Sequence, residues 1–408
     1  MKKLGFWNAG LIVLALGSLA LMAGCKPKDG GGESTGSTGS SSSTSGETAS
    51  GDKINIGLIA SINGDLRPWG SDCRDGAMLA VEEINAAGGI DGKMINLIVE
   101  DSNSKPEDGK TAAQKLASSD VVGLVGEVAS GITMQIKSVA LEAGLPLVAV
   151  GATNPDITKN SDGKVFRVCY TDDFQGPVMA KFAFQALGKK RAAIMTDNKQ
   201  PYSQELSKKF MAFFKSLGGE IVTEEFYESG QNQFTGQITN IKSKAPDVIF
   251  LSGYFTEVGP IARQIRQQGL NVPLLGGDGW DSKELVTSGG DAIIGGYFCN
   301  HYNNKEDRPE VQNFLTKWND KYGGEPATTM GALGYDAVML MIDGIKRGGT
   351  DKAKIAEALN NTEGFAGVSG VINLKDHNGD PPKRALVVEV TQDGQKFAKA
   401  YEPDEVFN

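Results

Sequence analysis

The feature that most constrains the fold is an alternation, from Lys53 onwards, between short runs rich in Val, Ile and Leu and amphipathic segments of helical length. Each apolar run has the length of a strand. Such alternation is typical of βαβ units, which build a mostly parallel sheet flanked by helices. We therefore predict an α/β fold, and no repeat of the solenoid kind accompanies the alternation.

The alternation falls into two arrays. The first predicts strands at 53–60, 94–101, 121–126 and 145–150, with helices near 72–87, 107–117 and 132–142. The second begins near "VFRVCYTDDFQG" and predicts strands at 191–197, 219–227, 246–253 and 272–278, each followed by a helical stretch or a return crossing at 295–304. Further helices are expected at 309–322, 330–346 and 352–359, before antiparallel strands around the turns "DHNGD" and "QDGQ".

Two arrays predict two lobes with a ligand cleft between them. Open parallel sheets bind ligands beyond the carboxyl ends of their strands, and ligand sites favour domain interfaces. Candidate binding residues should therefore follow directly after the predicted strands.

The N-terminus carries a targeting segment. Lys2 and Lys3 precede an apolar stretch that ends in "LMAGC" at Cys25. A charged start, a short apolar middle and small residues before the cut are typical of a signal peptide, here 1–24, rather than of a retained membrane span. The motif resembles the bacterial lipobox, with Met22 where leucine is usual, and this resemblance implies a diacylglycerol on Cys25. An ordinary signal peptide with an incidental cysteine is the alternative.

Residues 25–52 form a tether. From Asp29 to Asp52 the chain is almost all Gly, Ser and Thr, without a large apolar residue to pack, and such a segment behaves as a flexible coil. We predict a globular body from Lys53 to Asn408, long enough for two domains, held near a membrane but not embedded in it. The formal charge of −9 argues against a nucleic acid partner, since Lys and Arg must neutralise phosphates.

Neither the remaining cysteines nor the histidines predict a metal, cofactor or catalytic site. Cys73, Cys169 and Cys299 form no C-x-x-C pair, which argues against zinc. One disulfide plus a free thiol is open in an exported protein, but buried, inert thiols are favoured. His301 and His377 lack a triad-like partner, and no dinucleotide or nucleophile-elbow motif is present. We expect no enzyme and no cofactor.

Three strand ends predict a pocket for an amino acid. "GEVASGIT" places Ser130 at a helix start, where N–H groups bind anions, although an ordinary helix cap is the alternative. "VGATNP" offers the Gly151 carbonyl and the Thr153 hydroxyl, which accept hydrogen bonds from an ammonium group. "LLGGDGW" adds the carboxylate of Asp278, for which a solvated turn is the alternative. The aromatic residues Trp69, Tyr202 and Tyr254, each at or past a strand end, provide candidate walls.

These residues resemble a known family, the type I solute-binding proteins of branched-chain amino acid ABC transporters (the leucine/isoleucine/valine-binding proteins). The resemblance covers "GAMLAVEEINAAGGIDG", "ASGIT", "GATNPDIT", "DDFQGPVMAKF", "PYSQEL", "LSGYFTEVGPIARQIRQQGL" and "GGDGW" at matching separations. It implies a two-lobed periplasmic-binding-protein fold. The expected lobes are 53–172 plus 302–369 and 173–301 plus 370–408, joined by a multi-strand hinge.

The resemblance also implies a role for each site residue. A ligand carboxylate would bind Ser130, and the ammonium group would bind Gly151, Thr153 and Asp278. Side-chain contacts are expected from the aromatic residues Trp69, Tyr202, Tyr254 and Tyr335. Asp278 stands where the family has glutamate and Trp69 where tyrosine is common, and Glu127 beside the carboxylate site would favour a polar or cationic ligand if it pointed inward.

The function implied is capture of an amino acid, Leu, Ile or Val above others, by hinge closure and its delivery to a membrane permease. The protein is expected to be monomeric, exported and lipid-anchored, facing the periplasm or cell exterior. An amide- or urea-type binding protein, a binding protein for another amino acid, and a ligand sensor for a membrane receptor are the alternatives.

Overall fold

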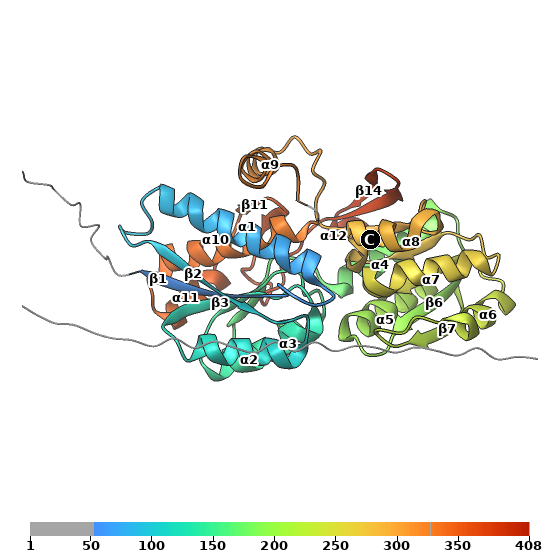
Figure 1. Ribbon diagram of the computed structural model, residues 1–408, viewed down its shortest axis with the longest axis horizontal. Coiled ribbons are helices and arrows are strands. Elements are labelled where there is room, and N and C mark those ends of the chain that lie inside the picture. The colour runs from blue at the N-terminus through green and yellow to red at the C-terminus, as the bar shows by residue number, and fades with distance from the viewer. Residues whose placement is uncertain (1–52, 327, 408) are drawn as a thin grey trace, which may run out of the picture. The chain divides into compact units, whose positions relative to one another are not determined.

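A computed structural model describes residues 53–326 and 328–407. The predicted signal peptide, Cys25 and the tether lie outside the described residues. Two sheets, each covered by helices, organise the described chain, and we call each sheet with its helices a lobe (Figure 1).

The first lobe is built on a five-stranded parallel sheet of order β2-β1-β3-β4-β5. Its strands are β1 Ile54–Ala60, β2 Ile95–Asp101, β3 Val121–Val125, β4 Leu147–Ala149 and β5 Val165–Arg167. Its helices are α1 Arg67–Ala86, α2 Pro106–Ala117, α3 Ser130–Glu142, α9 Pro309–Tyr322, α10 Met330–Gly348 and α11 Lys352–Asn360. Helices α1 and α10 cover one face of the sheet, and α2 and α3 cover the other (Figure 1).

The second lobe is built on a seven-stranded sheet of order β14-β13-β10-β9-β8-β6-β7. Its strands are β6 Arg191–Asp197, β7 Glu220–Tyr227, β8 Val248–Ser252, β9 Leu274–Gly276, β10 Tyr297–Asn300, β13 Ala385–Thr391 and β14 Gly394–Tyr401. Its helices are α4 Asp172–Lys181, α5 Pro201–Ser216, α6 Thr235–Ser243, α7 Phe255–Gln267, α8 Lys283–Gly289 and α12 Pro403–Phe407. β13 runs antiparallel to both of its neighbours, β10 and β14, and the other pairs in this sheet are parallel.

The remaining helices and strands of the described residues are short. A small antiparallel hairpin joins β11 Phe365–Gly367 and β12 Gly370–Ile372. The 3-10 turns are η1 Pro155–Ile157, η3 Asp278–Trp280 and η4 Gly290–Ala292, and α4 continues as the π-turn η2 Phe182–Ala186.

The predicted α/β architecture is confirmed, with two corrections. The segment "VFRVCY" forms β5, which pairs with β4 in the first sheet rather than opening the second array. The turn "DHNGD" does not join two paired strands, because β12 pairs backward with β11. In both cases the apolar pattern marks the strand but does not specify which strand it pairs with.

Glycine sets the close approach of α1 and α10. A Cβ on Gly76 of α1 would lie 1.9 Å from the Gly331 carbonyl oxygen, and one on Gly334 of α10 would lie 2.3 Å from the Cys73 carbonyl oxygen. Each helix therefore presents a bare backbone to the other, and a larger residue at either glycine would force the helices apart.

The chain passes between the lobes at three places in the described residues, and the buried Lys383 lies on the third passage, just before β13. The Lys383 ammonium donates to the Val168 carbonyl over 2.6 Å and to the Ser369 hydroxyl. The Ser369 hydroxyl in turn donates to Asp336 over 2.6 Å. Burial lowers the pKa of Lys383 to about 8, although the nearby Asp336 charge opposes the shift.

Candidate functional site

The first lobe presents the start of α3 at the carboxyl edge of its sheet. Ser130 is the first residue of α3 and is buried, and its hydroxyl oxygen accepts the Asn154 N–H over 3.3 Å. The N–H groups of a first helical turn have no intrahelical partner, so this end attracts an anion. A carboxylate could bind the Ser130 hydroxyl and the adjoining N–H groups here.

Glu127 does not point a free carboxylate into this space. One of its oxygens accepts the Ser61 hydroxyl at 2.6 Å and the Ser102 hydroxyl at 2.9 Å. The other accepts the N–H groups of Val128 at 2.6 Å and Ala129 at 2.9 Å. Because four donors already occupy it, the expectation that Glu127 would select a cationic ligand finds no support in the geometry.

The turn after β4 carries Gly151 and Thr153, and Arg167 fixes its shape. The Arg167 guanidinium donates to the Ala152 carbonyl over 2.6 Å and to the Asn154 carbonyl over 3.0 Å, while its Nε–H donates to Asp380 over 2.6 Å. No hydrogen bond reaches the Gly151 carbonyl from elsewhere in the described chain. This carbonyl and the Thr153 hydroxyl are therefore placed as acceptors.

The second lobe contributes Asp278, the first residue of η3 and only 2% exposed. Its Oδ1 accepts the Tyr202 hydroxyl at 2.9 Å and the Gln175 Nε2–H at 3.0 Å. Its Oδ2 lies 3.0 Å from His301 Nε2. The solvated-turn alternative for Asp278 is excluded by this burial.

Gln175 on α4 joins the acceptors of both lobes. Its Nε2 lies 3.3 Å from Thr153 Oγ1, 2.7 Å from Asp172 Oδ1 and 3.0 Å from Asp278 Oδ1. An amide nitrogen has two hydrogens, so three acceptors share two donors. We call these residues, Thr153, Asp172, Gln175 and Asp278, with the side chains around them, the cluster. Because acceptors outnumber the hydrogens of the Gln175 amide here, the cluster suits a ligand bearing N–H groups.

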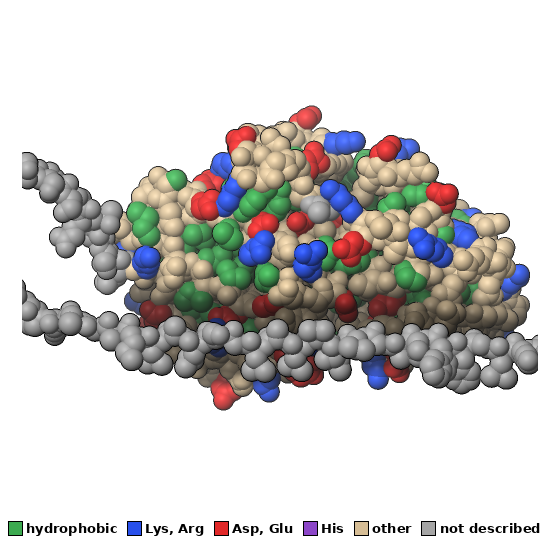
Figure 2. Space-filling view, in the orientation of Figure 1, with side chains coloured by type: hydrophobic (Ala, Val, Ile, Leu, Met, Phe, Trp, Pro, Cys, Tyr) green, Lys and Arg blue, Asp and Glu red, His purple; other side chains and the backbone are tan. Residues whose placement is uncertain are grey.

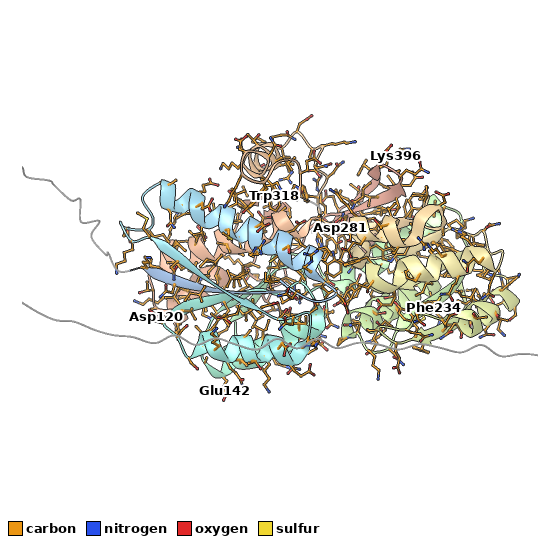
Figure 3. All side chains as sticks on the ribbon, in the orientation of Figure 1. Asp120, Glu142, Phe234, Asp281, Trp318 and Lys396 are labelled. Atoms are coloured by element: carbon orange, nitrogen blue, oxygen red, sulfur yellow. The ribbon has the colours of Figure 1, made fainter. Side chains whose placement is uncertain are left out.

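Aromatic side chains close one side of the cluster. The Trp69 indole N–H donates across the lobes to the Asp281 carbonyl over 2.6 Å. Asp281 is labelled near the middle of the ribbon in Figure 3. The Trp69 ring meets Tyr254 and Phe255 edge-on, with centroids 5.1 and 5.0 Å away. The Tyr254 ring stacks on Tyr202, and the Tyr254 hydroxyl has no partner in the described part of the chain.

Asp281 receives further donors from the first lobe. Its Oδ2 accepts the N–H of Thr329, just before α10, at 2.6 Å and the Thr329 hydroxyl at 2.8 Å. Its Oδ1 accepts the Gln395 amide from β14. Asp281 therefore ties the two lobes together three residues after Asp278.

A cavity of about 470 Å³ lies beside Pro68 and Phe255 and has walls from both lobes. Asp65 and Arg67 lie on the first-lobe side, and Thr256, Glu257 and Glu284 lie on the second-lobe side. On the surface visible in Figure 2, acidic and basic side chains are mixed.

Seven of the eight predicted ligand contacts lie at the facing strand ends, and one does not. Tyr335 on α10 donates its hydroxyl to Glu83 of α1 over 2.6 Å, and its ring packs on Phe314 of α9. The structure therefore does not bring Tyr335 to the cluster.

Four polar residues of the cluster were not singled out from sequence: Arg167, Asp172, Gln175 and His301. Arg167 ends β5 and His301 directly follows β10, whereas Asp172 and Gln175 lie in the first turn of α4. His301 stacks on Tyr170 with centroids 4.1 Å apart. One available signal was "DDFQ", which spaces Asp172 and Gln175 three residues apart and so on one face of a helix.

Neither a disulfide nor a metal site is found among the described residues. Cys73, Cys169 and Cys299 are unpaired and buried, in agreement with the favoured expectation, and burial raises the pKa of Cys169 to about 12. Over residues 53–326 and 328–407, no group of three or more His, Cys, Asp or Glu side chains is arranged to hold a metal ion. Nor does any helix in those ranges combine the length and apolar character that a membrane span requires.

Comparison with known sequences finds one family across most of the chain. Residues 53–395 match the family described as periplasmic binding protein. The Leu/Ile/Val-binding protein BraC3 of Rhizobium johnstonii is 34% identical over 310 residues, covering 75% of this chain and 83% of its own. A Leu/Ile/Val-binding protein homolog of Brucella melitensis is 30% identical over 347 residues, covering 84% and 92%.

Comparison with solved structures finds proteins of the same kind. A leucine-binding protein LivK from Thermotoga maritima superposes with a TM-score of 0.82 at 37% identity, covering 86% of this chain and 99% of that one. The branched-chain amino acid transporter substrate-binding protein LivJ from Streptococcus pneumoniae, in complex with isoleucine, superposes with a TM-score of 0.81 at 31% identity, covering 86% and 100%. The two-lobed fold predicted from sequence is confirmed.

Proposed function

The chain belongs to the periplasmic binding protein family, and from that premise we propose that it is the substrate-binding component of an ABC importer, capturing a branched-chain amino acid between its lobes. The similarity to Leu/Ile/Val-binding proteins and to an isoleucine complex supports this choice of ligand.

The observation that carries the proposal is the surplus of buried acceptors opposite an anion-binding helix end. The Gly151 carbonyl, the Thr153 hydroxyl and the Asp278 carboxylate would hold the α-ammonium group. Ser130 and the start of α3 would hold the α-carboxylate. A zwitterionic amino acid satisfies both ends at once, whereas an amide or urea satisfies neither charge.

The side chain of the ligand would lie against apolar groups. Trp69 and Tyr254 supply rings, and Val128 and Met330 are buried beside the Gly151 turn. Fully burying an aliphatic side chain contributes about 1.5–3 kcal/mol, which favours Leu, Ile or Val over smaller amino acids. Tyr335 takes no part.

We infer that binding closes the lobes about the three chain passages, without chemical change to the ligand. The contacts between Trp69 and Asp281, and between Asn154 and Pro201, join groups from different lobes and would form only on closure. We propose the lobes expected from sequence with one change: the third boundary moves from 369/370 to just before Ala385, because Lys383 bonds to Val168 and Ser369 of the first lobe.

The cellular setting is also proposed. Signal-peptide cleavage before Cys25 and its lipidation would anchor a monomer outside the cytoplasmic membrane, within reach of a permease. The family assignment supports an extracytoplasmic location, while the anchor depends on the "LMAGC" motif alone.

A thermal-shift panel tests the ligand class. Protein stripped of bound ligand by unfolding and refolding is mixed with free amino acids, amides, urea and small sugars. A ligand at 100 times its Kd stabilises by about 2.7 kcal/mol, and we expect that shift with Leu, Ile and Val. Shifts with amides but not amino acids would contradict the ammonium site.

The variant Asp278→Asn tests the site itself. Removing one partner of a buried charge pair costs about 2 kcal/mol or more, so the Kd for L-leucine should rise about 30-fold. Asp291→Asn, an exposed change in the same lobe, is the matched control and should leave the Kd unchanged.

A further inference from the structure

Asp172 is a buried carboxylate that the proposed binding mode leaves unused. It is the first residue of α4 and is fully buried. Its Oδ1 accepts the Gln175 Nε2–H at 2.7 Å, while its Oδ2 has no hydrogen-bond partner in the described residues. A buried carboxylate oxygen without a partner is costly, so it requires either a proton or a ligand.

A second carboxylate lies close by. The same Gln175 Nε2 that meets Asp172 also lies 3.0 Å from Asp278 Oδ1, so one amide nitrogen bridges both acids. Like charges that share a buried site disfavour double ionisation. Two acids linked in this way would retain a proton when no cation is bound.

The charges around Asp172 do not neutralise the pair. Arg167 is the cation that acts on it, but its N–H groups already bind Asp380 and the carbonyls of Ala152 and Asn154. The titratable groups that interact with Asp172 are Asp278, Arg167, Tyr202, Tyr254 and Cys299. Burial, reinforced by the Asp278 charge, holds the pKa of Asp172 well above its ordinary range, although hydrogen bonds from Gln175 and Thr153 oppose the shift. The His301 ring contacts Asp278 at Oδ2, not at the Oδ1 that Gln175 shares with Asp172.

We propose that Asp172 is a second carboxylate of the ammonium site, and that it holds a proton in the empty cleft which it gives up to solvent when the ammonium group of a ligand binds. The O–H bond of Asp172 breaks, the proton passes to the buffer, and the ligand keeps all three ammonium hydrogens. The inference rests on the proposed function for the ligand's charge, and it adds a binding residue and a proton to the reaction.

Proton release makes affinity depend on pH. Where Asp172 is protonated in the free protein, each ligand bound releases up to one proton, so the Kd for L-leucine should fall up to tenfold per unit rise in pH. The dependence should vanish above the pH at which the free protein has already lost that proton.

Calorimetric titration of the purified protein with L-leucine measures the release directly. Running the titration in phosphate and in Tris, which differ in ionisation enthalpy, gives the protons released per ligand. We expect close to one for the wild type and none for Asp172→Asn, with about tenfold weaker binding in the variant. Asp173→Asn, a change at the exposed neighbouring acid that pairs with half-buried Lys209, should match the wild type in both.

A ligand without the amino group distinguishes a direct effect of Asp172 on the ammonium group from a general structural effect of the substitution. The probe 4-methylpentanoate keeps the leucine side chain and carboxylate, so its Kd should be unchanged by Asp172→Asn. Equal weakening of both ligands, or undiminished proton release in Asp172→Asn, would overturn the proposal.

Infrared spectroscopy of the ligand-free wild type does not depend on the variant or on the identity of the ligand. We expect a protonated-carboxyl band that Asp172→Asn removes, and its absence from the wild type would overturn the proposal. Failure of the wild type to bind L-leucine while the band persists would instead reject the proposed function.

Discussion

Replacing Trp69 with phenylalanine tests whether one interlobe hydrogen bond governs the strength of ligand capture. The indole N–H of Trp69 donates to the Asp281 carbonyl over 2.6 Å in a buried setting. Phenylalanine keeps a ring against Tyr254 and Phe255 but has no donor, so closure would leave a buried carbonyl unpaired. That loss costs about 1–3 kcal/mol, which corresponds to a Kd about 5- to 150-fold weaker if the bond forms only on closure.

Calorimetry with L-alanine and L-leucine separates the hydrogen bond from ring contact with the ligand. The bond involves no ligand atom, so its loss should weaken both amino acids by the same factor. Loss of ring contact should weaken L-leucine more than L-alanine, because the larger side chain buries more apolar surface.

Trp280→Phe is the matched control. The Trp280 indole N–H also donates to a buried carbonyl, that of Leu251 at 3.1 Å, but both groups belong to the second lobe. We expect this variant to lower Tm and to change the Kd less than about threefold. Wild-type affinity in Trp69→Phe, or equal losses of affinity in both variants, would refute the reasoning.

Three further outcomes concern stability in urea or heat. Gly76→Ala should lower Tm by several degrees, because its Cβ would lie 1.9 Å from the Gly331 carbonyl; an unchanged Tm would contradict the close helix packing. Glu127→Gln should cost at least about 2 kcal/mol, since an amide cannot accept four donors, and no loss would show those bonds to be unimportant. Lys383 has a folded pKa of about 8, below its ordinary 10.5, so the unfolded chain binds the proton more tightly between these values and stability rises with pH there. Relative to Lys383→Met, the wild type should gain about 3 kcal/mol across that window, whereas it should show no such gain relative to Lys354→Met, a change at an exposed residue of α11.

Much of the fold was predictable because strand and helix periods are local signals. The helix expected at 309–322 has those bounds, since Pro309 begins it and Gly323 ends it. The helix expected from Asp72 begins five residues earlier at Arg67, because Pro68 fits a first helical turn.

The candidate site was predictable from sequence only where a polar side chain comes just after a predicted strand. Strand-end logic selects Ser130, Thr153 and Asp278, since the carboxyl ends of parallel strands share an edge. It gives no reason to select Asp172 or Gln175, whose importance comes from a contact between lobes. Tyr335 is the opposite case: it was expected in the site, but its side chain contacts Glu83 and Phe314 instead. A position on a helix does not reveal which neighbour the ring faces.

The turn that follows β9 has an evolutionary consequence. Within four residues, Asp278 addresses the proposed ligand, Trp280 anchors the turn to its own sheet, and Asp281 binds the opposite lobe. An insertion or deletion there would shift recognition and closure together. The length of "GGDGWD" is therefore under a double constraint.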